Sequence, residues 1–339
     1  MTPTGTRPRI GIAIASGMLK GVFGHGVLSA FEERGLRAQV YGTASSAVLS
    51  GGLAAVGRAR ATGVAYWHQA AAGAAGKGMS QVVLSSIEQY GPTLRDGLFR
   101  AGAPEFLLAT SRVTNPAAAE ITQGPGAKEL GRQLLRNIFT GDRTWVEENL
   151  AAEVFSSYAD ASSHADASSD ADDDAHADAS SDADAEGDAR ADADARGGRP
   201  RLTPENFDAV SYASTRMMHA WSVPAEVGGE AYVDASYTCA CPAREVAATG
   251  VTELIVIGAD PFPVFRDIYA SEEIVDGSTL DGATVRVIRP EDDLKVLGVD
   301  YAAASPEGLT GAYELGLAAG HRFADLRPGL LDPAGTPGA

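Results

Sequence analysis

The sequence contains few cysteines and few aromatic residues, and it lacks any long apolar run. Its two thiols, Cys239 and Cys241, are one residue apart. This is too sparse for a disulfide framework, so we expect ordinary reduced thiols, with redox or metal-binding roles as alternatives. No stretch of about twenty uninterrupted apolar residues occurs, which argues against a membrane-spanning helix. The apolar run after Arg7 and Arg9 is too short for a signal-peptide core. We therefore expect a soluble, cytoplasmic protein, with any membrane contact being peripheral.

Basic residues are also scarce, which gives a formal net charge of -18. Residues 159–199 hold thirteen acidic and three basic residues, so this Ala/Asp/Ser segment carries more than half of that charge. It has no large apolar side chain to offset its ordering entropy, and we expect a disordered acidic insertion over residues 156–200. Loose cation binding through His164 and His176 is the alternative. Nothing in the remaining sequence indicates nucleic-acid binding.

The rest of the chain has the pattern of a globular α/β protein. Hydrophobic residues make up 45% and charged residues 21% of the 339 residues, enough for a large buried core. Apolar runs alternate with amphipathic segments, which predicts an α/β sandwich with a mainly parallel central sheet. Strands are expected over residues 10–15, around 40–41, and over 105–113, 253–258 and 283–288. Helices are expected over residues 22–34, 64–75, 79–90, 128–137, 202–218 and 306–320, and from the turn at residue 45 toward residue 57.

Two turns near the N-terminus carry the chemical signal. The first apolar strand leads into a glycine turn at residues 16–21, and the second leads into a serine turn at Ser45. A serine on a sharp strand-to-helix turn is how α/β folds present a nucleophile. A glycine turn at a helix start can offer backbone N–H groups to an oxyanion. Together the two turns supply complementary halves of an acyl-transfer site.

A third element lies far along the chain, where the apolar stretch 231–233 enters a turn at Asp234. Taken singly, Ser45 would be read as a helix cap and Asp234 as an Asx-turn residue. Their joint placement with the glycine turn favours catalysis. No Gly-Lys-Ser/Thr follows the glycine turn and no metal-ligand cluster is visible, so neither a nucleotide cofactor nor a metal is expected.

These motifs resemble those of the patatin-like phospholipases. That family has a Gly-Gly-Gly-x-Arg-Gly oxyanion loop, a Gly-x-Ser-x-Gly nucleophile turn and a distant Asp-Gly-Gly or Asp-Gly-Ala turn. Here Ser16-Gly17-Met18-Leu19-Lys20-Gly21 lies on the first motif, Thr43-Ala44-Ser45-Ser46-Ala47 on the second and Asp234-Ala235-Ser236 on the third. An Ala-Ser pair at 213–214 and Pro242 fall at about the family's usual positions.

The resemblance implies a three-layer α/β/α sandwich formed by residues 1–155 and 201–328, with a flexible tail at 329–339. It also implies a lipid acyl hydrolase that acts on phospholipid or similar carboxylic esters through an acyl-enzyme. Ser45 and Asp234 would form a serine–aspartate dyad. The N–H groups of Gly17 and Met18 would line the oxyanion hole, and Lys20 and Gly21 would shape that loop.

Several motif positions depart from the family pattern and leave alternatives open. Thr43 and Ala47 replace the elbow glycines, and Ser16 and Met18 replace two loop glycines. A rival register takes residues 42–44 as the family's Gly-Thr-Ser and puts alanine at the nucleophile position. The alternative function is accordingly a catalytically eroded protein that binds lipid or a protein partner.

The dyad requires no histidine, but two histidines lie close to its motifs in the sequence. His25 follows the glycine turn, and His219 precedes Asp234. Either could serve as a third partner and complete a Ser-His-Asp triad. An ordinary structural histidine is the other reading of each.

Overall fold

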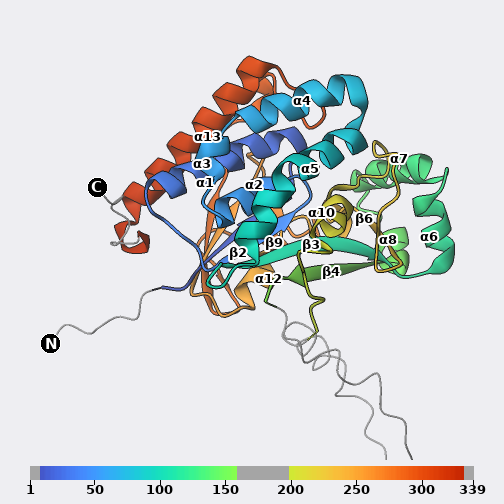
Figure 1. The fold of residues 1–339 in the computed structure, drawn as a ribbon, viewed down its shortest axis with the longest axis horizontal. Helices are drawn as coiled ribbons and strands as arrows, with labels where there is room; N and C mark the ends of the chain where they lie inside the picture. Colours follow the sequence, from blue (N-terminus) through green and yellow to red (C-terminus); the bar gives the residue numbers. More distant parts are fainter. Residues whose placement is uncertain (1–7, 159–197, 332–339) are drawn as a thin grey trace, which may run out of the picture.

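A computed structural model describes residues 8–158 and 198–331 (Figure 1). The chain is an α/β protein with a mixed, mostly parallel central sheet and surrounding helices. Most of the acidic insertion predicted at 156–200, and most of the tail at 329–339, lie outside the described residues, so those two predictions stay untested. No helix in the described part of the chain is long and apolar enough to cross a membrane.

The centre of the sheet is parallel. Its five strands lie in the order β11-β7-β1-β2-β3. Their bounds are β1 (Ile10–Ile14), β2 (Val40–Ala44), β3 (Glu105–Val113), β7 (Glu253–Ile257) and β11 (Ala283–Ile288). The strands at the middle read as near-continuous apolar runs because helices cover both of their faces. All five expected strands are therefore confirmed.

Antiparallel strands flank this centre. They are β4 (Leu150–Ser156), β5 (Glu226–Val227), β6 (Glu230–Val233) and β10 (Thr279–Leu280). Both β4 and β6 pair with β3, and a separate ribbon joins β8 (Val264–Phe265) to β9 (Glu273–Ile274). Neither β4 nor these short strands were predicted from the sequence, because β4 shows no regular alternation and the others are only two to four residues long.

Two apolar cores lie on opposite faces of the sheet, because side chains alternate along each strand. The larger core includes Ile12 and Tyr41 and packs against α1 (Val22–Glu33), α2 (Ala47–Ala55) and α13 (Pro306–Leu326). The smaller core packs against α11 (Ser236–Cys239) and α12 (Ala243–Ala247). Cys239 and Cys241 are free, buried thiols of this second core.

The other helices surround the larger core and the far edge of the sheet (Figure 1). They are α3 (Ala59–Thr62), α4 (Ala65–Lys77), α5 (Met79–Leu98), α6 (Pro116–Gln123), α7 (Ala127–Ile138), α8 (Thr144–Asn149) and α10 (Phe207–Thr215), with short 3-10 turns at Met18–Gly21, Leu294–Leu297 and Pro328–Leu330.

Three predicted helix boundaries were wrong. The helix expected at 306–320 continues as α13 to Leu326. The expected helix 79–90 continues as α5 to Leu98 and passes through Pro92. Pro92 is exposed, so the carbonyl that it leaves without a donor faces water, while Leu94 and Leu98 continue the buried stripe. The expected helix 202–218 is only α10, which begins at Phe207. Residues before it form a turn in which Thr203 and Asn206 hydrogen-bond each other's backbone N–H.

Helices α1 and α13 cross at very short range. A Cβ built at Gly316 would lie 2.0 Å from the backbone oxygen of Phe23, and one at Gly26 would lie 2.1 Å from the oxygen of Tyr313. Only glycine allows this approach, which fixes α1 and hence the glycine turn that precedes it. A Cβ built at Gly311, on the same helix α13, would lie 3.7 Å from its nearest neighbour, the Leu297 side chain, which is an ordinary contact.

We expect Gly316→Ala to lower the free energy of unfolding by about 1–3 kcal/mol, because the new methyl group overlaps backbone that cannot move alone. Gly311→Ala is the matched control and should raise the free energy of unfolding by up to about 1 kcal/mol, through helix propensity. Denaturant titration followed by circular dichroism measures both. Equal effects of the two substitutions would contradict the close crossing.

Candidate active site

Ser45 forms the tip of a sharp turn between β2 and α2. It directly follows Ala44, the last residue of β2, and its φ of 53° lies in the left-handed region that non-glycine residues seldom adopt. Its N–H donates to Ser214 Oγ at 2.9 Å, and its carbonyl accepts from Val48 at the start of α2. The backbone is thus held in a strained conformation that costs about 1–3 kcal/mol and that is characteristic of functional turns.

Thr43 fits this turn because glycine faces it. A Cβ at Gly51 of α2 would lie 2.3 Å from the Thr43 methyl group, so the bulk of threonine occupies space that the helix leaves free. The Thr43 hydroxyl donates to the Leu107 carbonyl at 3.2 Å. The β-branched Thr43 is therefore accommodated two positions before Ser45. The rival register would place Ala44 at the tip of the turn, but Ala44 is the last residue of the strand and Ser45 occupies the tip.

Sheet register brings Asp234 to Ser45. Ala44 pairs with Ala109 on one side of β3, and Val233 pairs with Ser111 on the other. The residues that follow Ala44 and Val233 therefore reach the same level of β3 from its two flanks. There the Ser45 hydroxyl donates to Asp234 Oδ2 at 2.8 Å. The structure thus joins two residues that lie 189 positions apart.

Asp234 is buried, and no cationic side chain among the described residues pairs with it. Its Oδ1 accepts the Ser236 N–H at 2.8 Å, and its backbone is held by the Ser111 hydroxyl, which donates to the Asp234 carbonyl. Burial raises the pKa of Asp234 to about 6, while the hydrogen bonds from Ser236 and Ser45 act in the opposite direction. A carboxylate of this kind is ionised at neutral pH and is a stronger base than an exposed one.

The glycine turn passes beside the serine turn. Met18 has a φ of 47°, and Gly17 has no room for a side chain because a Cβ would lie 2.3 Å from Ala259. The Gly17 N–H donates to Ser46 Oγ at 3.2 Å, whereas the N–H of Met18 meets no acceptor among the described residues. Of the two amides predicted for the oxyanion hole, Met18 offers a free donor and Gly17 is engaged.

Lys20 anchors this turn from behind. Its side chain is 2% exposed and pairs with Asp260, which follows β7, and with Asp293, which follows β11, the latter at 2.8 Å. The ammonium also lies 4.6 Å from the centre of the Tyr301 ring. Burial alone would lower the pKa of Lys20, but its hydrogen bonds and charge interactions with the two carboxylates outweigh it and raise the pKa. Lys20 therefore holds the loop in place and does not line the cavities at Ser45.

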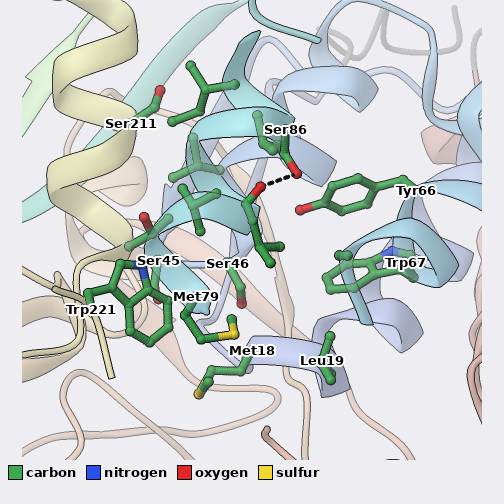
Figure 2. Close-up of a pocket in the computed structure, with 17 residues that line it drawn as sticks. Met18, Leu19, Ser45, Ser46, Tyr66, Trp67, Met79, Ser86, Ser211 and Trp221 are labelled. Atoms are coloured by element: carbon green, nitrogen blue, oxygen red, sulfur yellow. Dashed lines mark hydrogen bonds between the residues drawn. The ribbon is translucent and has the colours of Figure 1, made fainter. Parts of the chain in front are cut away.

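Two cavities meet at Ser45. The narrow compartment has a volume of about 50 Å³ in which the centre of a water molecule fits, and the wide cleft has about 520 Å³. Ser45 and Met18 line both. Figure 2 shows the narrow compartment, with Met18 at one end and Ser86 at the opposite end. Polar groups such as Asp260, together with exposed phenyl rings, border the wide cleft.

The two histidines weighed in the sequence analysis do not join the dyad. His25 is buried, accepts the Trp67 indole N–H at 2.9 Å and contacts the Ala59 carbonyl with its other nitrogen. Burial lowers its pKa to about 4. His219 borders the wide cleft, and burial lowers its pKa as well. Both oxygens of Asp234 are instead occupied by Ser45 and Ser236.

Sequence reasoning missed the residues that align the two turns. Ser214 accepts the Ser45 N–H and, through its carbonyl, the Ala235 N–H, so it joins the serine turn to the aspartate turn. The hydroxyl of Ser236 donates to Ser16 Oγ at 2.9 Å and joins the aspartate turn to the glycine turn. The Ala-Ser pair at 213–214 and Ser16 were visible in the sequence, but their hydrogen-bond partners lie too far away along the chain to be inferred.

Comparison with known proteins adds no family to this geometry. No protein-family model matches the chain, and a search of curated proteins finds no significant match. The likeness to patatin-like phospholipases therefore rests on the motifs alone. Any function must be argued from the site itself.

We expect Lys20→Met to lower the free energy of unfolding by about 1–3 kcal/mol. The substitution keeps the apolar stem but leaves Asp260 and Asp293 without their shared cation, and their partial exposure keeps the loss below that of a fully buried pair. Lys295→Met, which removes an exposed lysine near Asp300, is the control and should stay within about 0.5 kcal/mol. Urea unfolding compares them. If Lys20→Met left the free energy of unfolding unchanged, the anchoring role would be contradicted.

Proposed function

We propose that the protein is a serine-dependent carboxylic ester hydrolase of the lipid acyl hydrolase type. The observation that carries this proposal is the buried 2.8 Å hydrogen bond from the Ser45 hydroxyl to Asp234, at a turn whose backbone is held in the left-handed region. A serine and a base within hydrogen-bond distance are the minimum for nucleophilic acyl transfer. No cofactor or metal enters the proposed reaction.

In the proposed mechanism Ser45 Oγ attacks the ester carbonyl carbon while Asp234 takes the hydroxyl proton. The tetrahedral intermediate collapses, the alcohol leaves with the proton from Asp234, and the acyl group stays on Ser45. Water then attacks the acyl carbon and gives a proton to Asp234, and the acid is released as Ser45 leaves the acyl group and takes that proton from Asp234. A pKa of about 6 at Asp234 suits both directions of proton transfer near neutral pH.

The Met18 N–H is the proposed first donor to the oxyanion, since it has no acceptor among the residues described. The N–H of Ser46, the residue after the nucleophile, likewise has none within that part of the chain, and this is the second position from which related turns stabilise an oxyanion. One such donor is typically worth about 3–4 kcal/mol of transition-state stabilisation. Gly17 and Gly21 contribute space, and Lys20 contributes rigidity.

The family assignment belongs to the same proposal. The motifs, the parallel centre of the sheet and the helices on both of its faces support a patatin-like three-layer sandwich. On that basis the substrate is an acyl ester of lipid type, the protein acts in the cytoplasm, and any membrane contact is peripheral.

One observation favours the eroded alternative, a protein that binds lipid or a partner without hydrolysis. The Gly17 N–H is engaged by Ser46 Oγ, so one of the two amides of the family's oxyanion loop is not free. The hydrolase remains the better-supported function, because nucleophilic catalysis needs the Ser45–Asp234 hydrogen bond and a binding protein does not.

We expect a fluorophosphonate probe to form a single adduct, at Ser45. Ser45→Ala should abolish the labelling. Ser50→Ala should retain it, because Ser50 is a buried serine of the neighbouring helix α2 that donates to the Ala47 carbonyl and does not line either cavity. Peptide mapping by mass spectrometry locates the adduct. Folded protein that stays unlabelled would favour the eroded alternative.

The rate of this labelling should depend on the ionisation of Asp234. With a pKa of about 6 the carboxyl loses its basic form as the pH falls, so the rate should decrease about tenfold between pH 7 and pH 5. Asp234→Asn should label at least about a hundredfold more slowly and without this pH limb. Labelling reactions quenched at a series of times give the rate at each pH. An inflection of the rate–pH curve well above pH 7 would point to a different base.

A further inference from the structure

The hydroxyl of Ser46 faces the glycine turn and not its own helix. Ser46 is the N-cap residue of α2, a position at which a serine side chain usually accepts an N–H from the first turn of the helix. Here it makes no such bond, and its Oγ accepts the Gly17 N–H at 3.2 Å instead. The ordinary capping role therefore does not account for this side chain.

Packing places this hydroxyl against the glycine turn, beside Ser45. A Cβ built at Gly21 would lie 3.5 Å from Ser46 Oγ, so the hydroxyl rests against a position of the turn that has no side chain. Ser46 also lines the narrow compartment, together with Ser45 and Met18 (Figure 2). The hydroxyl thus lies where the serine turn and the glycine turn, the two halves of the proposed acyl-transfer site, meet.

The hydrogen bonds of Ser46 leave the proton of its hydroxyl unused. A serine hydroxyl donates one hydrogen bond and accepts up to two. The Gly17 N–H takes one acceptor position, while the Ser46 proton has no acceptor among the residues that the structure describes. A hydroxyl that accepts a hydrogen bond from an amide is polarised and becomes a stronger donor, because bonds in such a chain reinforce one another. Ser46 is only partly buried, so this proton is available to a ligand.

We propose that the Ser46 hydroxyl is an oxyanion donor of the site and that it transmits the effect of the Gly17 amide to the substrate. This inference rests on the proposed role of Ser45 as nucleophile. When Ser45 Oγ bonds to the ester carbon, the carbonyl oxygen gains a negative charge and accepts the Ser46 O–H alongside the Met18 N–H. No proton is transferred to the oxyanion, which becomes a carbonyl oxygen again as the alcohol leaves.

This role gives the engaged Gly17 amide a function. The patatin-like motif implies that the Gly17 N–H meets the oxyanion directly, whereas here Ser46 Oγ accepts that N–H. A hydroxyl in this place either donates its proton to the oxyanion or fills the space that the oxyanion needs. Its removal has opposite consequences in the two cases, because loss of a donor slows the reaction and loss of an obstacle speeds it. The free proton and its polarisation favour the donor.

Ser46→Ala removes the hydroxyl and leaves the backbone N–H at that position. We expect kcat for p-nitrophenyl butanoate to fall at least about tenfold, with KM changed less than about threefold, because the donor acts on charge that forms only in the transition state. Ser46→Thr keeps a hydroxyl and should restore kcat to within about threefold of the wild-type value. An increase in kcat, or no change, in Ser46→Ala protein would overturn the proposal.

The matched control is Ser50→Ala, four positions further along. Ser50 is buried, donates to the Ala47 carbonyl and lines neither cavity, so its substitution should leave kcat and KM unchanged. An equal loss of kcat in both variants would mean that the start of α2 is merely disturbed, and would overturn the role of Ser46.

The ionisation of a bound adduct distinguishes a donor from a residue that only shapes the site. Ser45 Oγ adds to the carbonyl carbon of 1,1,1-trifluorooctan-2-one, and the ketone oxygen becomes the hemiketal oxygen. Its ionisation is followed against pH by fluorine nuclear magnetic resonance. Loss of a tenfold stabilisation should raise the hemiketal pKa by about one in Ser46→Ala protein. An unchanged hemiketal pKa would overturn the proposal even if kcat fell.

Fluorophosphonate labelling separates this inference from the proposed function. Ser46→Ala should label at Ser45 at least about tenfold more slowly than wild type, because the phosphonyl oxygen also gains negative charge. If wild type labels and Ser46→Ala labels as fast or faster, only the role of Ser46 is wrong. If folded wild-type protein does not label, the hydrolase function is wrong, and the role of Ser46 is wrong with it. Circular dichroism of each variant shows whether slower labelling arises at the site or from unfolding.

Discussion

The site depends on one buried hydrogen bond, between the Ser45 hydroxyl and Asp234 Oδ2. Its two ends belong to turns on either flank of β3, and the two turns are far apart in the sequence. The bond exists because the pairing register of β3 with β2 and with β6 brings both turns to the same level. The hydroxyls of Ser111 and Ser214 then hold the backbone of the two turns in place. Any slip of one strand by a residue would separate the pair.

This arrangement carries costs that the rest of the fold offsets. Ser45 and Met18 occupy the left-handed region, and Asp234 is buried with no cation beside it in the part of the chain that the structure describes. Each feature is unfavourable by itself, and each is also what the proposed nucleophile, oxyanion donor and base would require. Two cores on opposite faces of the sheet supply the stability against which such strain can persist. Lys20 adds a specific anchor, because its ion pairs join the glycine turn to loops that follow β7 and β11.

Much of this could be predicted from the sequence, because it depends on local patterns. The apolar run 105–113 predicted β3 with its observed bounds, and the small residues around Ser45 predicted a strand-to-helix turn. What could not be predicted depends on contacts between distant residues. The fit of Thr43 against Gly51 requires knowing how α2 lies over β2. The partners of Lys20 lie 240 and 273 positions away. Pro92 remains inside α5 because tertiary packing outweighs a local signal.

The central claim is that Ser45 carries the acyl group during turnover. Intact mass spectrometry of protein quenched in acid during hydrolysis of p-nitrophenyl butanoate tests it directly, followed by peptide mapping of any adduct. We predict one butanoyl group per chain, bonded to Ser45, with none formed by Ser45→Ala protein. Hydrolysis that proceeds with no acyl adduct, or with the adduct on another residue, would contradict the account.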